Sequence, residues 1–583
     1  MDACFRRALV SILTALIGVG GLAESAPGRV FEVGPVDGVL DLTFAYGLSV
    51  RTQQRDFDFV GIANGGRVPS VNFDDGNLNY DQGVFANEFR FTGDLTLAWR
   101  NFGVFVRGFG FYDFESELSD RDRTELSRGA RSRVGAGGEL REYYLSANFT
   151  PGGMPIQFRV GKQTLNWGAG NFLRFGVDVV NPIDFVALTR PTATLRDLFT
   201  PQGMIWAASN VTELIAIEAF YQYDWEPVVD APVGTFFSAD DLIGAGVMNK
   251  YVTGAGDFSD LGTDLDDELG LVPGTLGFDA NFMRVPSAGR DDPRDQGQYG
   301  FTVQMFLPML NAASLRVHFI NYHSRLPIIS GIAADQDAID AAVAIGDTNP
   351  SEDQKLLEFG RLSNETSFVA QYPEDIKMLG VSFDGALPYF GTLVDFEISH
   401  HFNWPVQIFS DRVIETALSP LRNALEGVPP GPVGADEVVS GIDETHKTQL
   451  AVGFAQAFGP RLWSAQSILA VNIGWVHFDG LSKGSLFDED SWGYSIKGAL
   501  SYDGVFGGAN LEPFLAFTHD VSGITPGPAG AFLEERKSVA IGLTVNYTNS
   551  ITADFIYVNF FDGKPLNAGV DRDFFSFSLR YYY

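Results

Sequence analysis

The sequence has 583 residues, of which 19% are charged; it contains 50 phenylalanines and 65 glycines, and its 28 prolines are scattered without a repeating period. This composition excludes a coiled coil, a collagen and an intrinsically disordered chain. The formal net charge of −33 would repel phosphate backbones, so nucleic-acid binding is excluded as well.

The N-terminus has the pattern of a secretory signal peptide, which we place at residues 1–25. Arg6 and Arg7 form a short positive region ahead of an apolar stretch at 8–22. The remaining residues, 26–583, are expected to form one exported domain. Export leaves three destinations for this domain: the medium, the periplasm or the outer membrane.

The exported domain is expected to lack two common features. The only cysteine is Cys4, inside the signal peptide, so we expect no disulfide and no lipid anchor. After residue 26 no apolar run of about 18 residues occurs, so we expect no membrane-spanning helix.

Residues 39–51 alternate between apolar and polar or small side chains. Leu42, Phe44 and Tyr46 share one face of the predicted strand. A period of two over this length exceeds a soluble strand of about 5–6 residues and fits a tilted membrane crossing of about 9–11. Eighteen segments have this pattern, some imperfectly: 39–51, 84–100, 103–115, 138–150, 156–166, 203–210, 214–225, 297–306, 313–324, 376–384, 392–401, 446–458, 467–478, 492–502, 511–520, 536–547, 551–561 and 573–583.

The connections between these segments alternate in length. Those after even-numbered strands are short, such as 548–550, and those after odd-numbered strands are long, such as 226–296 and 325–375. Membrane barrels sort their loops in this way, whereas a soluble β-sandwich or propeller has no reason to do so. We therefore predict an all-β fold, a closed antiparallel transmembrane β-barrel of about 18 strands, alternatively about 16, with short helices in long extracellular loops.

Three long connections have patterns of their own. Residues 254–270 concentrate acidic side chains, which fits either a Ca²⁺ site or a solvated acidic rim bridged to lipopolysaccharide by divalent ions. Ser351 and Gln354 have the spacing of a helix-capping box, and 411–425 has apolar residues at helical spacing. The apolar, proline-punctuated segment 167–202 is the candidate for a constriction folded into the lumen.

Charged residues opposite the apolar stripes are expected to face the lumen. On the lipid side, an Arg or Lys at mid-membrane would cost about 2–4 kcal/mol. These side chains could select a solute, or they could form a self-neutralising network that fills the lumen. They are Arg90, Asp94, Arg107, Glu142, Arg159, Glu218, Arg316, Asp395, Glu397 and Lys497.

The sequence offers little support for catalysis. None of the seven histidines has the spacing of a zinc site, and no G-x-S-x-G motif occurs. His400 and His401 are adjacent on a predicted strand, so they point to opposite faces and cannot bind one ion together. We expect no enzymatic activity and, apart from Ca²⁺ in the acidic loop, no cofactor.

Several strings resemble a bacterial outer-membrane family catalogued as domain of unknown function 1302. They include GKQTLNWG, VVNPID, EAFYQYDWEP, HFINYHSRLP and YPEDIKMLGVSF, and the resemblance extends from about residue 30 to the end. It implies a β-barrel in the outer membrane of a Gram-negative bacterium, often associated with periplasmic partners and an inner-membrane export permease. The matching polar and aromatic residues are further pore candidates: Lys162, Gln163, Asn166, Trp167, Asn181, Asp184, Tyr223, Trp225, His323, Arg325, Glu374 and Asp375.

The patterns predict a channel or transporter, and the resemblance implies that its solute is a small hydrophobic, lipid-like or amphipathic molecule. Its surroundings would be outer-membrane lipid and lipopolysaccharide. A general porin-like diffusion channel is one alternative, and a surface barrel with a structural or adhesive role and no transport is another.

Overall fold

The computed structural model describes residues 28–168, 173–238, 240–244, 250–311, 313–387, 391–429, 431–481, 486–528 and 530–583. The predicted signal peptide at 1–25 lies outside the described residues, and so does Cys4.

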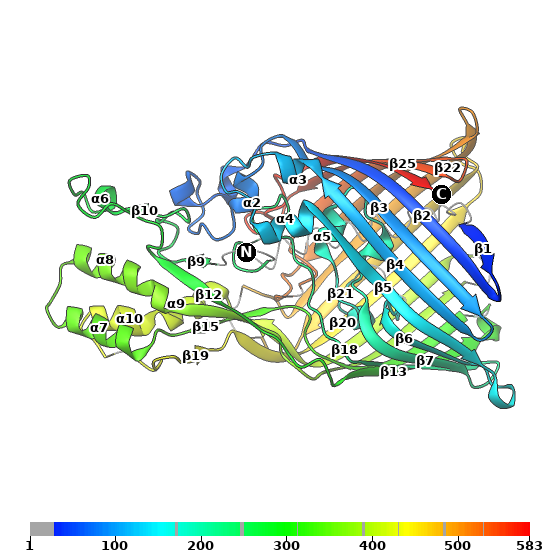
Figure 1. The fold of residues 1–583 in the computed structure, drawn as a ribbon, viewed down its shortest axis with the longest axis horizontal. Helices are drawn as coiled ribbons and strands as arrows, with labels where there is room; N and C mark the ends of the chain where they lie inside the picture. The colour runs from blue at the N-terminus through cyan, green and yellow to red at the C-terminus, as the bar shows by residue number, and fades with distance from the viewer. Residues whose placement is uncertain are drawn as a thin grey trace.

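Eighteen antiparallel strands form a closed barrel, as predicted (Figure 1). Each strand pairs with its sequence neighbours in the barrel, and the first, β2, also pairs with the last, β26. Closure leaves no sheet edge in the membrane, where no water can satisfy backbone groups. The strands are β2 (Val36–Arg51), β3 (Gly83–Trp99), β4 (Phe102–Asp113), β5 (Ala136–Phe149), β6 (Ile156–Gln163), β7 (Gln202–Asn210), β8 (Ile215–Gln222), β13 (Gln298–Leu307), β14 (Ala313–Tyr322), β17 (Ile376–Ala386), β18 (Leu393–Gln407), β20 (Ile442–Phe458), β21 (Gln466–Phe478), β22 (Asp490–Val505), β23 (Ala509–Ser522), β24 (Lys537–Tyr547), β25 (Ile551–Phe561) and β26 (Phe574–Tyr582).

The period-two pattern separates the two faces of the wall. On β2, Phe44 and Tyr46 are 37% and 38% exposed on the outside, whereas Ala45 and Ser49 are buried inside. The outward rows of the other strands are likewise apolar, with Phe301 and Ile541 more than half exposed. A continuous apolar outer surface on a closed antiparallel barrel is suited to a lipid bilayer and not to water.

Short and long loops lie at opposite ends of the barrel, as the sequence predicted. Short turns such as 548–550 lie at one end, which we take as the periplasmic end. The short strand β1 (Arg29–Val33) pairs with β2 there, and Figure 1 places β1 and the C-terminus at this end. The long loops emerge at the opposite end, which we label extracellular by the same rule.

An extension projects from the extracellular end, on the left in Figure 1. Its five-stranded sheet has the order β19-β15-β16-β12-β9, and β12 and β16 run parallel. A separate hairpin pairs β10 with β11. These strands, which the alternation did not reveal, are β9 (Lys250–Val252), β10 (Thr263–Asp264), β11 (Phe278–Asp279), β12 (Arg284–Asp291), β15 (Ile328–Ile332), β16 (Ser367–Gln371) and β19 (Val438–Val439).

The helices lie in the connections. Ser351 and Gln354 form the predicted capping box of α8, and the helical pattern at 411–425 forms α9 and α10, with Pro420 in the first turn of α10. Among the described residues, none of the helices has the length and apolarity to cross a membrane. The α-helices are α2 (Asp75–Leu78), α3 (Phe114–Leu118), α4 (Arg128–Val134), α5 (Phe185–Thr189), α6 (Leu265–Glu268), α7 (Gln336–Gly346), α8 (Glu352–Leu362), α9 (Ser410–Ala417) and α10 (Ser419–Leu425). Short 3-10 helices are η1 (Phe57–Phe59), η2 (Ile62–Asn64), η3 (Pro151–Gly153), η4 (Val177–Val180), η5 (Leu195–Leu198), η6 (Pro308–Leu310) and η7 (Ser363–Glu365).

Candidate functional site: the lumen and its infolded segment

The described residues of the connection between β6 and β7, 164–168 and 173–201, fold into the barrel, and we call them the infolded segment. Its backbone is held from distant parts of the wall. Lys447 Nζ on β20 donates to the carbonyl oxygen of Phe175 at 2.9 Å, and Arg580 Nη2 on β26 donates to that of Ala193 at 3.0 Å. The infolded segment therefore crosses the lumen and contacts the wall at β20 and β26.

One half of the infolded segment packs as a hydrophobic core against the inner wall. Burying each Val or Leu side chain contributes about 1.5–3 kcal/mol relative to exposure. This half is therefore a fixed part of the lumen. Its buried side chains are Leu165, Trp167, Leu173, Val177, Val179 and Val180, and they share a cluster with wall residues that include Met204, Trp206, Phe220, Ile320, Met378 and Val476.

Two carboxylates of the wall hold this apolar half in place. Glu218 accepts hydrogen bonds from the indole nitrogens of Trp167, at 3.0 Å, and Trp206, at 3.2 Å. Glu397 Oε1 accepts one from the backbone nitrogen of Val177 at 3.0 Å. All these groups are partly or fully buried, so each hydrogen bond satisfies a polar atom that would otherwise lose water without replacement.

The other half of the infolded segment is held by ion pairs around Asp197. Arg90 Nη2 lies 2.7 Å from Asp197 Oδ1, and Arg107 Nη2 lies 3.9 Å from it. Burial alone would raise the pKa of Asp197, but Arg90, Arg107 and hydrogen bonds from Thr194 outweigh it and lower the pKa to about 2. Asp197 therefore remains ionised at any physiological pH.

Arg196 extends this charge network along the wall. Its guanidinium lies 3.3 Å from Asp94 and 3.1 Å from Glu142, and Arg107 also contacts Asp94 at 3.2 Å. Four predicted lumen residues, Arg90, Asp94, Arg107 and Glu142, are thus brought together. They are neutralised largely by one another and by the infolded segment.

Arg141 belongs to the same network although strict alternation would place it on the lipid face. Arg107 pairs with Glu142, but Gly108 pairs with Leu140, which leaves Arg141 as an extra residue in β5. Such a β-bulge turns two consecutive side chains to one side. Both Arg141 and Glu142 are consequently buried in the lumen.

A cavity of about 310 Å³ lies between the infolded segment and strands β3 to β6. Among the residues that line it, Arg141 forms an ion pair with Asp184, the N-cap residue of α5, at 3.1 Å. The volume is that of a small-molecule site. The cavity is lined by cations, carboxylates and two phenylalanines: Arg90, Arg133, Arg141, Lys162 and Arg190; Glu139, Asp184, Asp197 and Glu226; Phe109 and Phe111, with smaller residues between them.

Several candidates from the family resemblance form a polar layer at the loop ends of β6 and β8. Lys162 Nζ contacts Glu226 at 2.6 Å. Arg325 donates to Gln222 Oε1 at 2.6 Å and to the carbonyl oxygen of Glu226 at 3.1 Å. Burial lowers the pKa of Arg325 to about 9, against the smaller opposing effect of Glu226. Gln163 donates to a backbone carbonyl of β7, so this layer also ties β6 to β7.

The remaining rim candidates hold loops to one another. His323 Nδ1 accepts a hydrogen bond from the backbone nitrogen of Asp375 at 3.0 Å, and its Nε2 lies 2.9 Å from the carbonyl oxygen of Gln296. Arg294 contacts Glu374 at 3.0 Å and Asp375 at 2.6 Å. These residues lie at the extracellular mouth and not inside the lumen.

The other candidates are dispersed. Arg159 stacks over Trp206 at 4.6 Å, Lys497 lies over Phe514, and Arg316 forms an ion pair with Asp384. Asn181 binds the backbone of Leu165 within the infolded segment, Trp225 packs on Tyr372, and Asn166 is exposed. Asp395 is partly buried beside Gly453 on the neighbouring strand. Tyr223, 43% exposed, continues the outward row of Tyr221, because the period of two persists past the end of β8.

The acidic residues at 254–270 do not gather into one site. Asp266 accepts hydrogen bonds from the backbone nitrogens of residues 274, 275, 276 and 277, so its carboxylate closes a turn. Asp260 points instead to Arg123. Within the described part of the chain, three carboxylates close enough to share an ion occur elsewhere, at Asp74, Asp75 and Asp241.

A family model that matches almost the whole chain confirms the family resemblance. The model of the family described as "Protein of unknown function (DUF1302)" matches residues 6–583. The chain belongs to this family. No curated protein matches the sequence.

Among solved structures, the chain is similar to OccAB3 of Acinetobacter baumannii, with 9% identity and a TM-score of 0.42 over 94% of this chain and 99% of that one. It is similar to OccK2 (OpdF) of Pseudomonas aeruginosa, solved with glucuronate, with 9% identity and a TM-score of 0.41 over 94% and 97%.

Glu397→Leu should loosen the apolar half of the infolded segment. The Val177 amide would lose its buried acceptor, at a cost of about 1–3 kcal/mol. Hydrogen exchange of a peptide covering 173–180 should become roughly tenfold faster or more. Asp395→Leu, two residues earlier on the same strand, is the matched control and should leave this exchange unchanged. Equal exchange in the Glu397 variant and the wild type would show that this contact does not hold the segment.

Proposed function

We propose that the protein is an outer-membrane channel for small amphipathic anions of a lipid-like kind. The solute passes between the infolded segment and the wall formed by β3 to β6. The closed barrel with its apolar outer surface supports the membrane channel, and the cavity beside the infolded segment supports the choice of solute. The chemistry of that cavity is the observation that carries the proposal.

The cavity combines an excess of cationic side chains with aromatic surface. Five Arg or Lys residues and four carboxylates line it. Phe109 and Phe111 lie beneath Arg90 and Arg190, whose guanidinium carbons are 4.2 and 3.7 Å from the ring centroids. A solute with a carboxylate head and an apolar body matches this lining, because the head meets cations and the body meets the ring edges.

A purely hydrophobic route along 167–202 has less support. The apolar side chains Trp167, Leu173 and Val177 are 5%, 2% and 0% exposed, so they are already packed against the wall. The cavity lies instead on the charged side of the infolded segment. On the basis of the family resemblance alone, we extend the proposal to a partnership with an inner-membrane export permease.

Planar-bilayer recordings with sodium octanoate test the proposal. We expect a steady current that octanoate blocks in the millimolar range, while the neutral analogue octanamide blocks at least several-fold less. Arg133→Glu should weaken the octanoate block several-fold, because Arg133 lines the cavity. Arg128→Glu, on the same helix α4 but outside the cavity lining, should leave the block unchanged. A current insensitive to octanoate would contradict the choice of solute.

A second function, binding of an extracellular partner without transport, is favoured by the projecting extension. Its sheet and helices α7 to α10 stand clear of the barrel mouth in Figure 1. The same recordings separate the two functions. A barrel that stays silent in the bilayer would favour the binding role over the channel.

A further inference from the structure

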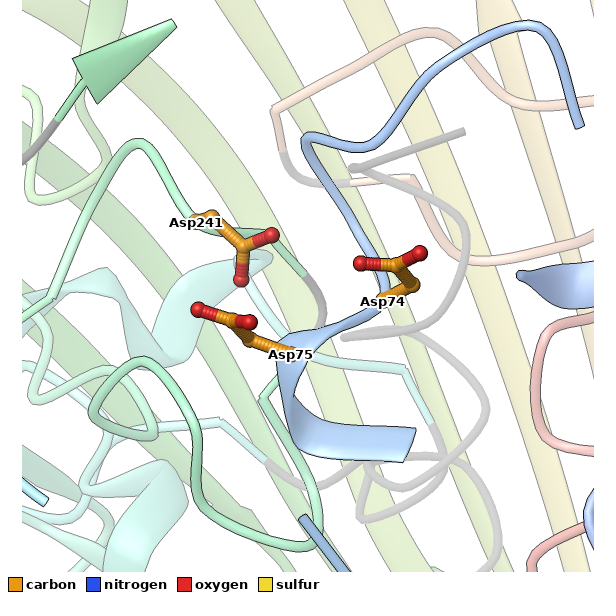
Figure 2. Close-up of side chains that lie close together, drawn as sticks. All are labelled: Asp74, Asp75 and Asp241. Atoms are coloured by element: carbon orange, nitrogen blue, oxygen red, sulfur yellow. The ribbon is translucent and has the colours of Figure 1, made fainter. Parts of the chain in front are cut away.

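Three aspartates from two extracellular loops come together outside the lumen. Asp74 and Asp75 belong to the loop after β2, and Asp241 belongs to the loop after β8. Each offers a carboxylate oxygen, and these oxygens lie within 4.8 Å of one another. Figure 2 shows the carboxylates of Asp241 and Asp75 pointing toward each other, with Asp74 beside them. All three residues are buried.

Two of these carboxylates, those of Asp74 and Asp75, have hydrogen-bond or ion-pair partners in the protein. Asp74 accepts hydrogen bonds from the backbone nitrogen of Gly61 at 2.7 Å and from Asn64 Nδ2 at 2.9 Å. Asp75 Oδ1 lies 3.4 Å from Arg123 Nε and accepts a hydrogen bond from the Thr124 hydroxyl at 3.3 Å. Among the described residues, none of these groups also donates to Asp241.

Asp241 has no such partners. It is 7% exposed, and neither of its carboxylate oxygens has a hydrogen-bond partner among the described residues. Leaving a buried ionised carboxylate without a partner costs several kcal/mol, so native proteins pair such groups or bind cations with them. The position of Asp241 opposite Asp75 therefore points to a ligand between them.

Among the described residues, the cations near this group do not form a hydrogen bond with Asp241. Asp260 adds a fourth carboxylate, and Arg123 is the cation in ion-pair contact with this group within the described residues. Lys250 and Arg284 stand nearby but donate to the backbone carbonyl of Asp260. Burial, together with the neighbouring carboxylates, raises the pKa of Asp75 to about 7 and that of Asp241 well above its ordinary value.

Described residues of both loops are joined to one another beside the three carboxylates. Asn72 accepts a hydrogen bond from the backbone nitrogen of Val252 at 2.7 Å, and its own carbonyl accepts one from that of Asp241 at 3.0 Å. At Gly76 the two loops touch, since a Cβ there would collide with Ser238. Pre-formed ligands favour ion binding because little ordering entropy is lost.

We propose that Asp74, Asp75 and Asp241 bind a divalent cation, Ca²⁺, which ties the loop after β2 to the loop after β8. Ligands that are all oxygens select a hard cation. Ca²⁺ tolerates the irregular geometry of carboxylates drawn from two loops, whereas Mg²⁺ demands a near-ideal octahedron and keeps several waters. The cation supplies Asp241 with the partner that no described protein group provides. The site is separate from the lumen and does not depend on the channel function.

Calorimetric titration of the full-length, detergent-purified, chelator-treated protein with CaCl₂ tests this proposal. We expect one Ca²⁺ per chain in the wild type, and at least tenfold weaker binding for Asp241→Asn and for Asp75→Asn. Mg²⁺ should bind at least tenfold more weakly than Ca²⁺. The heat-dependent shift of the barrel on a denaturing gel checks that each variant is folded.

Asp267→Asn is the matched control, because Asp267 is an exposed acid in the segment 254–270. It should retain wild-type Ca²⁺ binding. Absence of Ca²⁺ binding in the wild type, or equal binding in folded Asp241→Asn, would overturn the site. Loss of binding in Asp267→Asn would place the ion in 254–270 instead, and Mg²⁺ binding as tight as Ca²⁺ binding would overturn the choice of cation.

Discussion

Replacing residues 165–200 by a short Gly-Ser turn should raise the single-channel conductance several-fold. The infolded segment crosses the lumen, and a barrel of this size is wide enough for an aqueous channel once it is empty. The wall should survive the change because β6 and β7 are paired to their ends, with Gln163 opposite Gln202. The measurement is the conductance in planar bilayers at fixed salt.

The control for this experiment removes structure outside the barrel. Deleting α7 and α8 (336–362) shortens the extension but leaves the lumen filled, so the conductance should stay at the wild-type value. If both deletions gave the same conductance as the intact chain, the infolded segment would not be the barrier to ion flow.

Asp197→Leu should release the charged half of the infolded segment. Arg90 and Arg107 would remain buried without their shared carboxylate, and breaking a buried pair in this way costs about 3–5 kcal/mol. We expect noisy recordings with frequent openings in place of a steady level. Asp384→Leu, which removes the partner of Arg316 on the wall, is the control and should leave the recording steady.

Acid should affect the wild type only at very low pH. The folded-state pKa of Asp197 is about 2, below its ordinary value of 3.8. The stabilisation from this carboxylate is therefore complete above about pH 4 and is lost as the pH falls through about 2. Wild-type recordings should stay steady down to pH 4, whereas the Asp197 variant should be noisy throughout. Wild-type noise that begins near pH 6 would point to a different anchor for the segment.

The barrel could be predicted from the sequence because lipid imposes a simple rule on it. Every second side chain must be apolar, so rows such as Phe44 and Tyr46 are visible without any knowledge of contacts. The sorting of loop lengths supplied independent support. The short strands of the extension were not visible, because strands as brief as β19 contain too few residues to show a period.

The lumen was only partly predictable because its contacts join residues far apart in the chain. Arg90 and Asp197 are separated by 107 positions, so neither indicates the other. Arg141 escaped prediction because a bulge breaks the period of two at that point. The apolar, proline-rich composition of 167–202 allowed its infolding to be predicted. That composition did not identify the wall residues that the infolded segment contacts.

The anchors of the infolded segment also constrain how the molecule is built. Lys447 and Arg580, which hold the backbone at 175 and 193, belong to strands that are synthesised long after the segment itself. The segment therefore cannot make both contacts until β20 and β26 are in place. We therefore expect the complete set of contacts across the lumen to form only after the last strand has joined the wall.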